Sequence, residues 1–70
     1  MRFRDLRDKR REAQANANRD DEPFVLIRDG LDIEPVPKRL KYSFLLSEKH
    51  KGSEPLDGEE FYPAPTGVRV

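Results

Sequence analysis

The sequence predicts a small α+β protein: an N-terminal helix, a β-hairpin with a third short strand, and an extended, proline-containing C-terminal arm. Three observations predict this class. The first 20 residues contain many helix formers and neither Gly nor Pro. An Asp-Gly pair then lies between two runs of β-favouring residues. Finally, five of the six prolines and three of the four glycines lie at or after Pro35, which favours short elements and an extended end.

The chain is expected to form one small domain in three parts. Residues 1–20 form the charged helix, residues 21–47 the small sheet module, and residues 48–70 a polar loop and the arm. A chain of 70 residues buries a smaller share of its surface than a larger domain does. A single core of this size rarely supplies more than about 3–5 kcal/mol. We therefore expect a partner, or further copies of the chain, to complete the fold.

The first helix is predicted from Phe3 to about residue 18. Its apolar side chains follow steps of three, four and seven, with Arg10 between them, which puts them on one face: Phe3, Leu6, Ala13 and Ala17. This stripe is thin, because only its first two members are large, so the helix would dock weakly and at close range. Phe3 and Leu6, the two large side chains of this stripe, are therefore candidate partner contacts.

A hairpin is predicted around Asp29-Gly30, a pair that suits a type I′ turn of two residues. The predicted register places Arg28 opposite Leu31, Leu26 opposite Ile33 and Phe24 opposite Pro35. One face of the hairpin then carries the candidate core, Phe24, Leu26, Leu31 and Ile33. The other face is half apolar and half acidic, with Val25, Ile27, Asp32 and Glu34, and it needs cover from the helix or another chain. Pro35 and Pro37 are expected to end the second strand, because proline cannot donate to a ladder.

Residues 40–47 are predicted to form the third strand. Leu40, Tyr42, Phe44 and Leu46 alternate with mostly polar neighbours, but Leu45 breaks the alternation, so a short helix remains an alternative. Residues 48–60 are polar and contain two glycines and a proline, which predicts a loop.

The last ten residues are predicted to form an extended arm, because they contain two prolines and a glycine. Its apolar side chains, Phe61, Tyr62, Val68 and Val70, are candidate anchors that could lie across a neighbour or add a strand to its sheet. The alternative is a C-terminus that is disordered in solution.

Composition excludes several classes of site. The chain has no Cys and one His, so neither a disulfide framework nor a structural zinc site is expected. The longest apolar run is four residues and no apolar segment follows the first charges, so we expect neither a membrane span nor a signal peptide. These features favour a soluble protein made in a reducing cytoplasm, with no cofactor and no metal.

An enzyme is also not expected. The four glycines form no phosphate-binding loop, and His50 with nearby serines in a polar loop makes no convincing nucleophile and base. Paired carboxylates would need a cleft, and a chain this short has little core from which to build one.

Nucleic-acid binding is the alternative function. Basic residues gather at positions 2–11 and 38–51, the second group beside Tyr42 and Phe44, so phosphate contacts with aromatic stacking are conceivable. The candidate residues are Arg4, Arg7, Arg11, Lys38, Arg39 and Lys41. Against this function, 14 basic and 14 acidic side chains cancel, and acids are interleaved through the first helix.

A structural or assembly protein is the function that the pattern favours most. A helix of the form Phe3-x-Asp5-Leu6-x-x-x-Arg10-x-Glu12-Ala13, followed by Glu22-Pro23-Phe24-Val25-Leu26 and a hairpin, resembles small structural and assembly proteins of tailed bacteriophages of actinobacteria. That group includes tail assembly chaperones and small head or tail virion components, and the likeness covers roughly the first 35 residues. It implies a non-enzymatic protein, made in the host cytoplasm and then part of the virion. Such a protein would bind many copies of a larger capsid or tail protein, and the resemblance carries over no functional residues.

Overall fold

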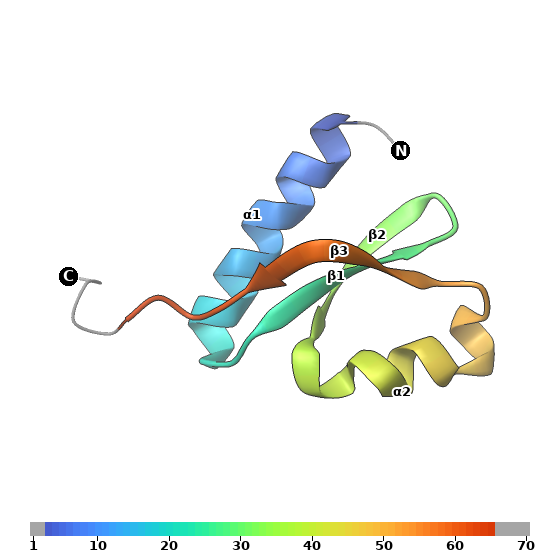
Figure 1. Cartoon of the computed structure of the whole chain (residues 1–70). Coiled ribbons are helices and arrows are strands. Elements are labelled where there is room, and N and C mark those ends of the chain that lie inside the picture. Colours follow the sequence, from blue (N-terminus) through green and yellow to red (C-terminus); the bar gives the residue numbers. More distant parts are fainter. Residues whose placement is uncertain (1–2, 66–70) are drawn as a thin grey trace.

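The computed structural model of the chain describes residues 3–65, with side chains for residues 6–65. The elements are α1 (Phe3–Asp20), β1 (Phe24–Asp29), β2 (Asp32–Pro37), η1 (Lys38–Leu40), α2 (Lys41–Leu46), η2 (Glu48–His50) and β3 (Glu54–Phe61), where η marks a 3₁₀ turn. The strands form one antiparallel sheet in the order β2-β1-β3. α1 and α2 lie on opposite sides of it (Figure 1). The predicted small α+β class is confirmed.

The predicted N-terminal helix is confirmed as α1. Ala13 and Ala17 are fully buried against the sheet and Leu6 packs beside them, so the small side chains allow a close approach. The residue that follows the helix, Asp21, has the left-handed conformation, with φ of 55°. The backbone N–H of Glu22 donates to the carbonyl oxygen of Ala17 at 3.3 Å, which is the long hydrogen bond of a Schellman motif.

The hairpin forms, but its predicted register is wrong by two residues. Leu26 pairs with Pro35, Arg28 with Ile33, and Asp29 with Asp32, so the turn consists of Gly30 and Leu31. Gly30 has φ of 69° and Leu31 does not have positive φ, which is the pattern of a type II′ turn with Gly first. A shift of two keeps every strand residue on its predicted face. Only Leu31 is lost from the predicted core, because it lies in the turn and is 93% exposed.

Pro35 lies within the second strand, contrary to the prediction, whereas β2 does end at Pro37. β2 is at the edge of the sheet, so proline is tolerated where its nitrogen faces away from β1. The two prolines are two residues apart and therefore face the same way. Beyond them, the N–H of Lys38 donates to the carbonyl oxygen of Pro23 at 2.9 Å.

The strand predicted at residues 40–47 is wrong, and the helical alternative is correct. Residues 38–46 form η1 and α2. Phe44 and Leu45 are adjacent in sequence, yet both pack against the same face of the sheet. A helix allows two neighbouring residues to share one buried side, whereas a strand sends them to opposite faces.

The third strand comes instead from residues 54–61, most of which were predicted to be loop. β3 pairs with β1 at both ends, Arg28 with Glu54 and Phe24 with Phe61. Between these ends, residues 56–59 lie opposite the single residue Leu26, and the resulting bulge contains Gly58 at φ of 77°. The bulge allows Leu56 and Phe61 to pack against the same core as α1.

Two small cores result, one on each face of the sheet. The core under α1 contains Ala13, Ala17, Phe24, Leu26 and Ile33. The core under α2 contains Val25, Ile27 and Val36, covered by Phe44 and Leu45. The chain therefore covers both sheet faces itself, including the one predicted to need cover.

Candidate interaction site

The α2 side of the sheet is held by two apolar side chains and one histidine. Phe44 and Leu45 are partly buried on the smaller core. The ring of His50 stacks on Phe44, with centroids 3.8 Å apart and an angle of 12° between the planes. Its Nδ1 lies 2.8 Å from Oδ2 of Asp29, at the end of β1. His50 therefore ties the segment after α2 to the sheet.

A groove opens between β2 and α2. It has a volume of about 410 Å³ and is lined by Val36, Pro37, Leu40, Ser43, Phe44, Ser47 and His50. Most of this lining is apolar, and its one ionisable side chain is that of His50. Its lining comes from the end of β2, from η1 and α2, and from the segment after α2.

Large apolar side chains of the same segment are exposed. Tyr42 and Leu46 are 72% and 83% exposed, and Leu40, at the groove, is 40% exposed. Tyr42 and Leu46 stand one helical turn apart, so both project from the outer side of α2. We call Leu40, Tyr42 and Leu46, together with the groove, the α2 surface.

No protein-family model, curated protein sequence or solved structure matches the chain.

The residues predicted as partner contacts lie apart from the α2 surface. Leu6 and Phe61 are partly buried against the chain's own core under α1. Tyr62 is 54% exposed. Phe3 belongs to α1 but its side chain lies outside the described residues, as do Val68 and Val70 entirely. Of the six, Tyr62 is the one whose described side chain is classed as exposed, although its hydroxyl is hydrogen-bonded to Lys38 and Glu60.

The start of the arm lies along α1. The side-chain N–H of Gln14 donates to the carbonyl oxygen of Tyr62 at 2.7 Å, and the N–H of Ala64 donates to Oδ1 of Asn18 at 2.8 Å. Gln14 also donates to Asn18 at 3.1 Å. These bonds fix the path of residues 62–64 beside the last turns of the helix. The rest of the predicted arm, residues 66–70, lies outside the described part of the chain.

A polar cluster joins the ends of β2 and β3. Nζ of Lys38 donates to the Tyr62 hydroxyl at 3.0 Å and lies 3.4 Å from Glu60, to which the same hydroxyl donates at 2.9 Å. These hydrogen bonds, to Tyr62 first and then to Glu60, raise the pKa of Lys38. In the same way, the Tyr62 hydroxyl and then Lys38 lower the pKa of Glu60. Both charges are therefore held in their ionised forms.

The structure separates the candidate nucleic-acid residues. Lys38 is bound to Glu60 and Tyr62, and Nε of Arg39 donates to Glu22 at 2.8 Å. Lys41 lies over the ring of its neighbour Tyr42, 5.8 Å from the centroid. Arg7 and Arg11 are exposed on α1, and the side chain of Arg4 is outside the described set. These cations occupy different elements on opposite sides of the sheet and do not form one continuous basic face.

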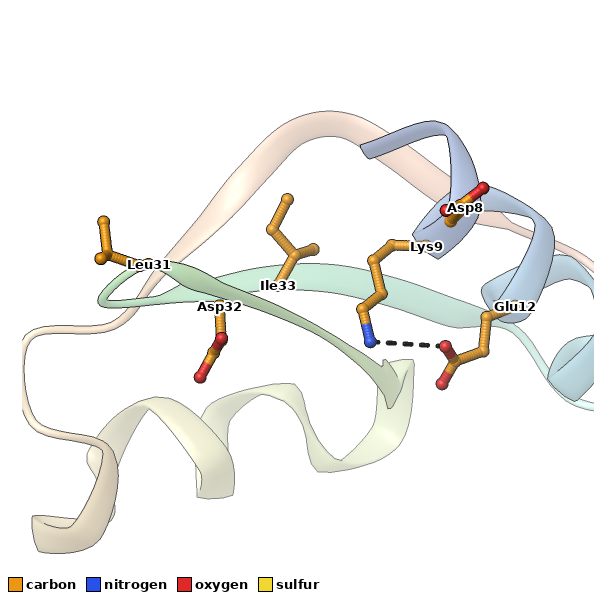
Figure 2. A pocket seen from close by; sticks show the side chains of 6 residues that line it. All are labelled: Asp8, Lys9, Glu12, Leu31, Asp32 and Ile33. Atoms are coloured by element: carbon orange, nitrogen blue, oxygen red, sulfur yellow. Dashed lines mark hydrogen bonds and ion pairs between the residues drawn. The ribbon is translucent and has the colours of Figure 1, made fainter. Parts of the chain in front are cut away.

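A second hollow, of about 300 Å³, lies between α1 and the hairpin and is lined by Asp8, Lys9, Glu12, Leu31, Asp32 and Ile33. Figure 2 shows Ile33 and Asp32 on opposite sides of β2, Leu31 at the hairpin tip, and Lys9 bridging to Glu12. The Lys9–Glu12 distance is 3.4 Å. The hollow is open and charged, and within the described residues no three side chains are placed to hold a metal ion.

The described part of the chain contains no helix with the length and apolar character needed to cross a bilayer.

The sequence analysis placed Leu40, Tyr42 and Leu46 on a strand and so did not predict that α2 would expose them. Two signals could have found them. Leu45 interrupts the alternation of residues 40–46, and Leu40 and Phe44 are separated by the helical spacing of four. His50 was weighed as a zinc ligand, as a catalytic base and as part of a basic cluster, whereas its contacts are with Phe44 and Asp29.

Proposed function

We propose that the protein is a non-enzymatic structural or assembly protein that binds a larger protein through the α2 surface. The observation that carries this proposal is the exposure of Leu40, Tyr42 and Leu46 on the segment that also lines an apolar groove. Clustered exposed apolar side chains with a polar rim mark protein interaction sites more often than isolated ones do. Tyrosine in particular is enriched where interfaces bind tightly.

The resemblance of roughly the first 35 residues to small proteins of tailed bacteriophages supports a more specific partner. On this basis the partner is a capsid or tail protein present in many copies. The protein would be made in the host cytoplasm and then incorporated into the virion.

A photo-crosslinking residue at position 42 tests the proposal in cells that make the assembled particle. We expect it to capture a single larger structural protein, identified by mass spectrometry as a repeated subunit of the particle. The matched control is the same residue at position 15, an exposed alanine on the opposite side of the sheet. Equal capture from both positions would contradict the proposal.

Nucleic-acid binding is the second candidate, and one observation favours it. Arg7 and Arg11 are exposed one turn apart on α1, and no ion-pair partner faces them among the described side chains. Binding through phosphates weakens steeply as salt rises. We expect no sequence-independent binding of DNA or RNA at moderate salt. Binding that Arg7→Glu with Arg11→Glu abolishes would instead favour this second function.

A further inference from the structure

We propose that Asp57-Gly58 is a site of spontaneous isoaspartate formation in the folded protein, and that the second Asp-Gly pair, Asp29-Gly30, is protected by its contacts. The chain contains seven aspartates, and these two are the ones that glycine follows. Glycine has no Cβ, so its backbone nitrogen is open to attack by the preceding side chain. The inference goes beyond the proposed function and does not depend on the partner.

The reaction needs no enzyme and no reactant other than water. The backbone nitrogen of Gly58 attacks the side-chain carboxyl carbon of Asp57, and a C–N bond forms while the bond to the carboxyl hydroxyl breaks. The hydroxyl leaves with the amide proton as water, which closes a succinimide ring. Water then opens the ring at one of its two carbonyl carbons. One opening restores aspartate, and the other leaves the chain running through the side chain, as isoaspartate.

Asp57 lies in the bulge of β3, where the ladder to β1 is interrupted. Residues 56–59 face the single residue Leu26, so regular pairing does not fix the backbone around Asp57. Asp57 and Gly58 are both exposed. Within the described residues, no hydrogen bond or ion pair engages the Asp57 carboxylate, and Lys41, which lines the same small hollow, forms none with it. The Asp57 side chain is therefore able to turn toward the Gly58 nitrogen.

Asp29 lies in a different environment. Its Oδ2 is 2.8 Å from Nδ1 of His50, and its backbone pairs with Asp32 at the base of the hairpin turn. Ring closure needs the carboxyl group to turn toward the Gly30 nitrogen and to lose an oxygen, so the contact with His50 must break first. Space around the glycines is not the difference. Beyond the adjacent residues, no heavy atom lies within 4 Å of the position that a Cβ on Gly30 or on Gly58 would occupy.

Isoaspartate at position 57 would change β3 itself. It adds one carbon atom to the backbone, because the chain then passes through the side-chain methylene. The residues that follow make contacts with β1 and α1. Phe61 lies opposite Phe24, and Glu59 accepts a hydrogen bond from Nε of Arg10 at 2.7 Å. The longer backbone displaces these contacts, so we expect the modified form to melt at a lower temperature than the unmodified chain.

Incubation in heavy-oxygen water tests the inference on the full, folded chain. Each opening of the ring adds one oxygen atom from the solvent, whether the residue returns to aspartate or becomes isoaspartate. After transfer to ordinary water, trypsin releases the two pairs separately, in residues 29–38 and 52–69. Mass spectrometry measures the label, and electron-transfer fragmentation identifies isoaspartate. We expect residues 52–69 to react about tenfold faster than residues 29–38, because the hydrogen bond between Asp29 and His50 must break before Asp29 reacts.

Three controls show whether the structure causes this difference. In urea the unfolded chain should react at similar rates in both peptides. Asp57→Glu keeps the charge but requires a larger ring, so residues 52–69 should gain almost no label while residues 29–38 react as before. His50→Phe keeps a ring beside Phe44 but removes the hydrogen bond to Asp29, and it should raise the labelling of residues 29–38 about tenfold.

The outcomes that would overturn the inference are distinct. Equal labelling of the two peptides in the folded chain would show that both pairs react only through global unfolding. Absence of label in residues 52–69, over a period in which the chain in urea reacts, would show that the fold protects Asp57 as well. If the purified isoaspartate form melts at the temperature of the unmodified chain, the predicted effect on β3 is wrong.

Discussion

α1 covers one face of the sheet with a helix of 18 residues, whereas α2 covers the other with six. On the α1 side, polar bonds reinforce the apolar contacts. Nε of Arg10 donates to Glu59 at 2.7 Å, and Gln14 and Asn18 hold the chain after β3. On the α2 side, the apolar cover is Phe44 and Leu45, with His50 as an added tie. The difference shows that the α1 face is covered more completely, whereas the segment on the α2 face leaves Tyr42 and Leu46 exposed.

The largest expected effect compares the two faces with one chemical change. Leu26→Ala removes a fully buried side chain on the α1 side and should cost about 2–5 kcal/mol of unfolding free energy. Leu45→Ala removes a partly buried side chain on the α2 side. It should cost distinctly less, because folding removes less of the Leu45 side chain from water. Urea titration followed by circular dichroism measures both. Equal losses of unfolding free energy in the two variants would contradict the difference between the two faces.

The next effect tests how closely α1 approaches the sheet. Ala17→Leu places a large side chain where alanine is fully buried, and overpacking of this kind should cost about 1–3 kcal/mol. Ala15→Leu makes the same change two residues away, on the exposed side of the helix, and should alter thermal stability little. A close approach is not supported if the two variants melt at the same temperature.

A smaller and stabilising effect is expected at the end of α1. Asp21→Gly relieves a left-handed conformation that glycine adopts more easily, so the unfolding free energy should rise by about 0.5–1 kcal/mol. The neighbouring variant Asp20→Gly changes the last residue of the helix and removes its ion pair with Arg19, so it should lower stability instead, since glycine disfavours helix. Thermal melts of the two variants should therefore shift in opposite directions.

The smallest effect concerns the pH dependence of the polar cluster formed by Lys38, Glu60 and Tyr62. The pKa of Glu60 is held below its ordinary value of 4.5 by the Tyr62 hydroxyl and Lys38. Its contribution to stability is therefore present above the ordinary value and is lost as pH falls through the lowered one. Melting temperatures of the wild type and Glu60→Gln, compared from neutral to acid pH, should differ at neutral pH and converge in acid. A difference that persists unchanged in acid would show that Glu60 acts through something other than its charge.

The elements that could be predicted from the sequence are those encoded by neighbouring residues. The α1 stripe, with Leu6, Ala13 and Ala17, needs only the helical period, and the hairpin needs only a turn glycine between β-favouring runs. The strand faces were also predicted correctly, because a register error of two residues preserves them.

β3 and α2 could not be predicted because distant residues determine them. Residues 54–61 contain a proline, a glycine and four acids, and they become a strand because β1 offers its second edge. The apolar residues between positions 40 and 46 fit both the strand period and the helical period. The helix is favoured because it covers Val25 and Ile27. The candidate site follows from that outcome. Phe61 and Leu6 entered the chain's own core, and Tyr42 and Leu46 became exposed.

The two outer strands also affect how the protein behaves when it is crowded. An open sheet edge with free N–H groups is a template for aggregation, and proline, charge and bulges suppress it. β2 carries Pro35 and Pro37 on its open edge, and β3 carries Pro55, a bulge and four acidic side chains. At high local concentration, neighbouring molecules should therefore not join their sheets into fibres. Such resistance suits a protein that accumulates at high concentration before it is used.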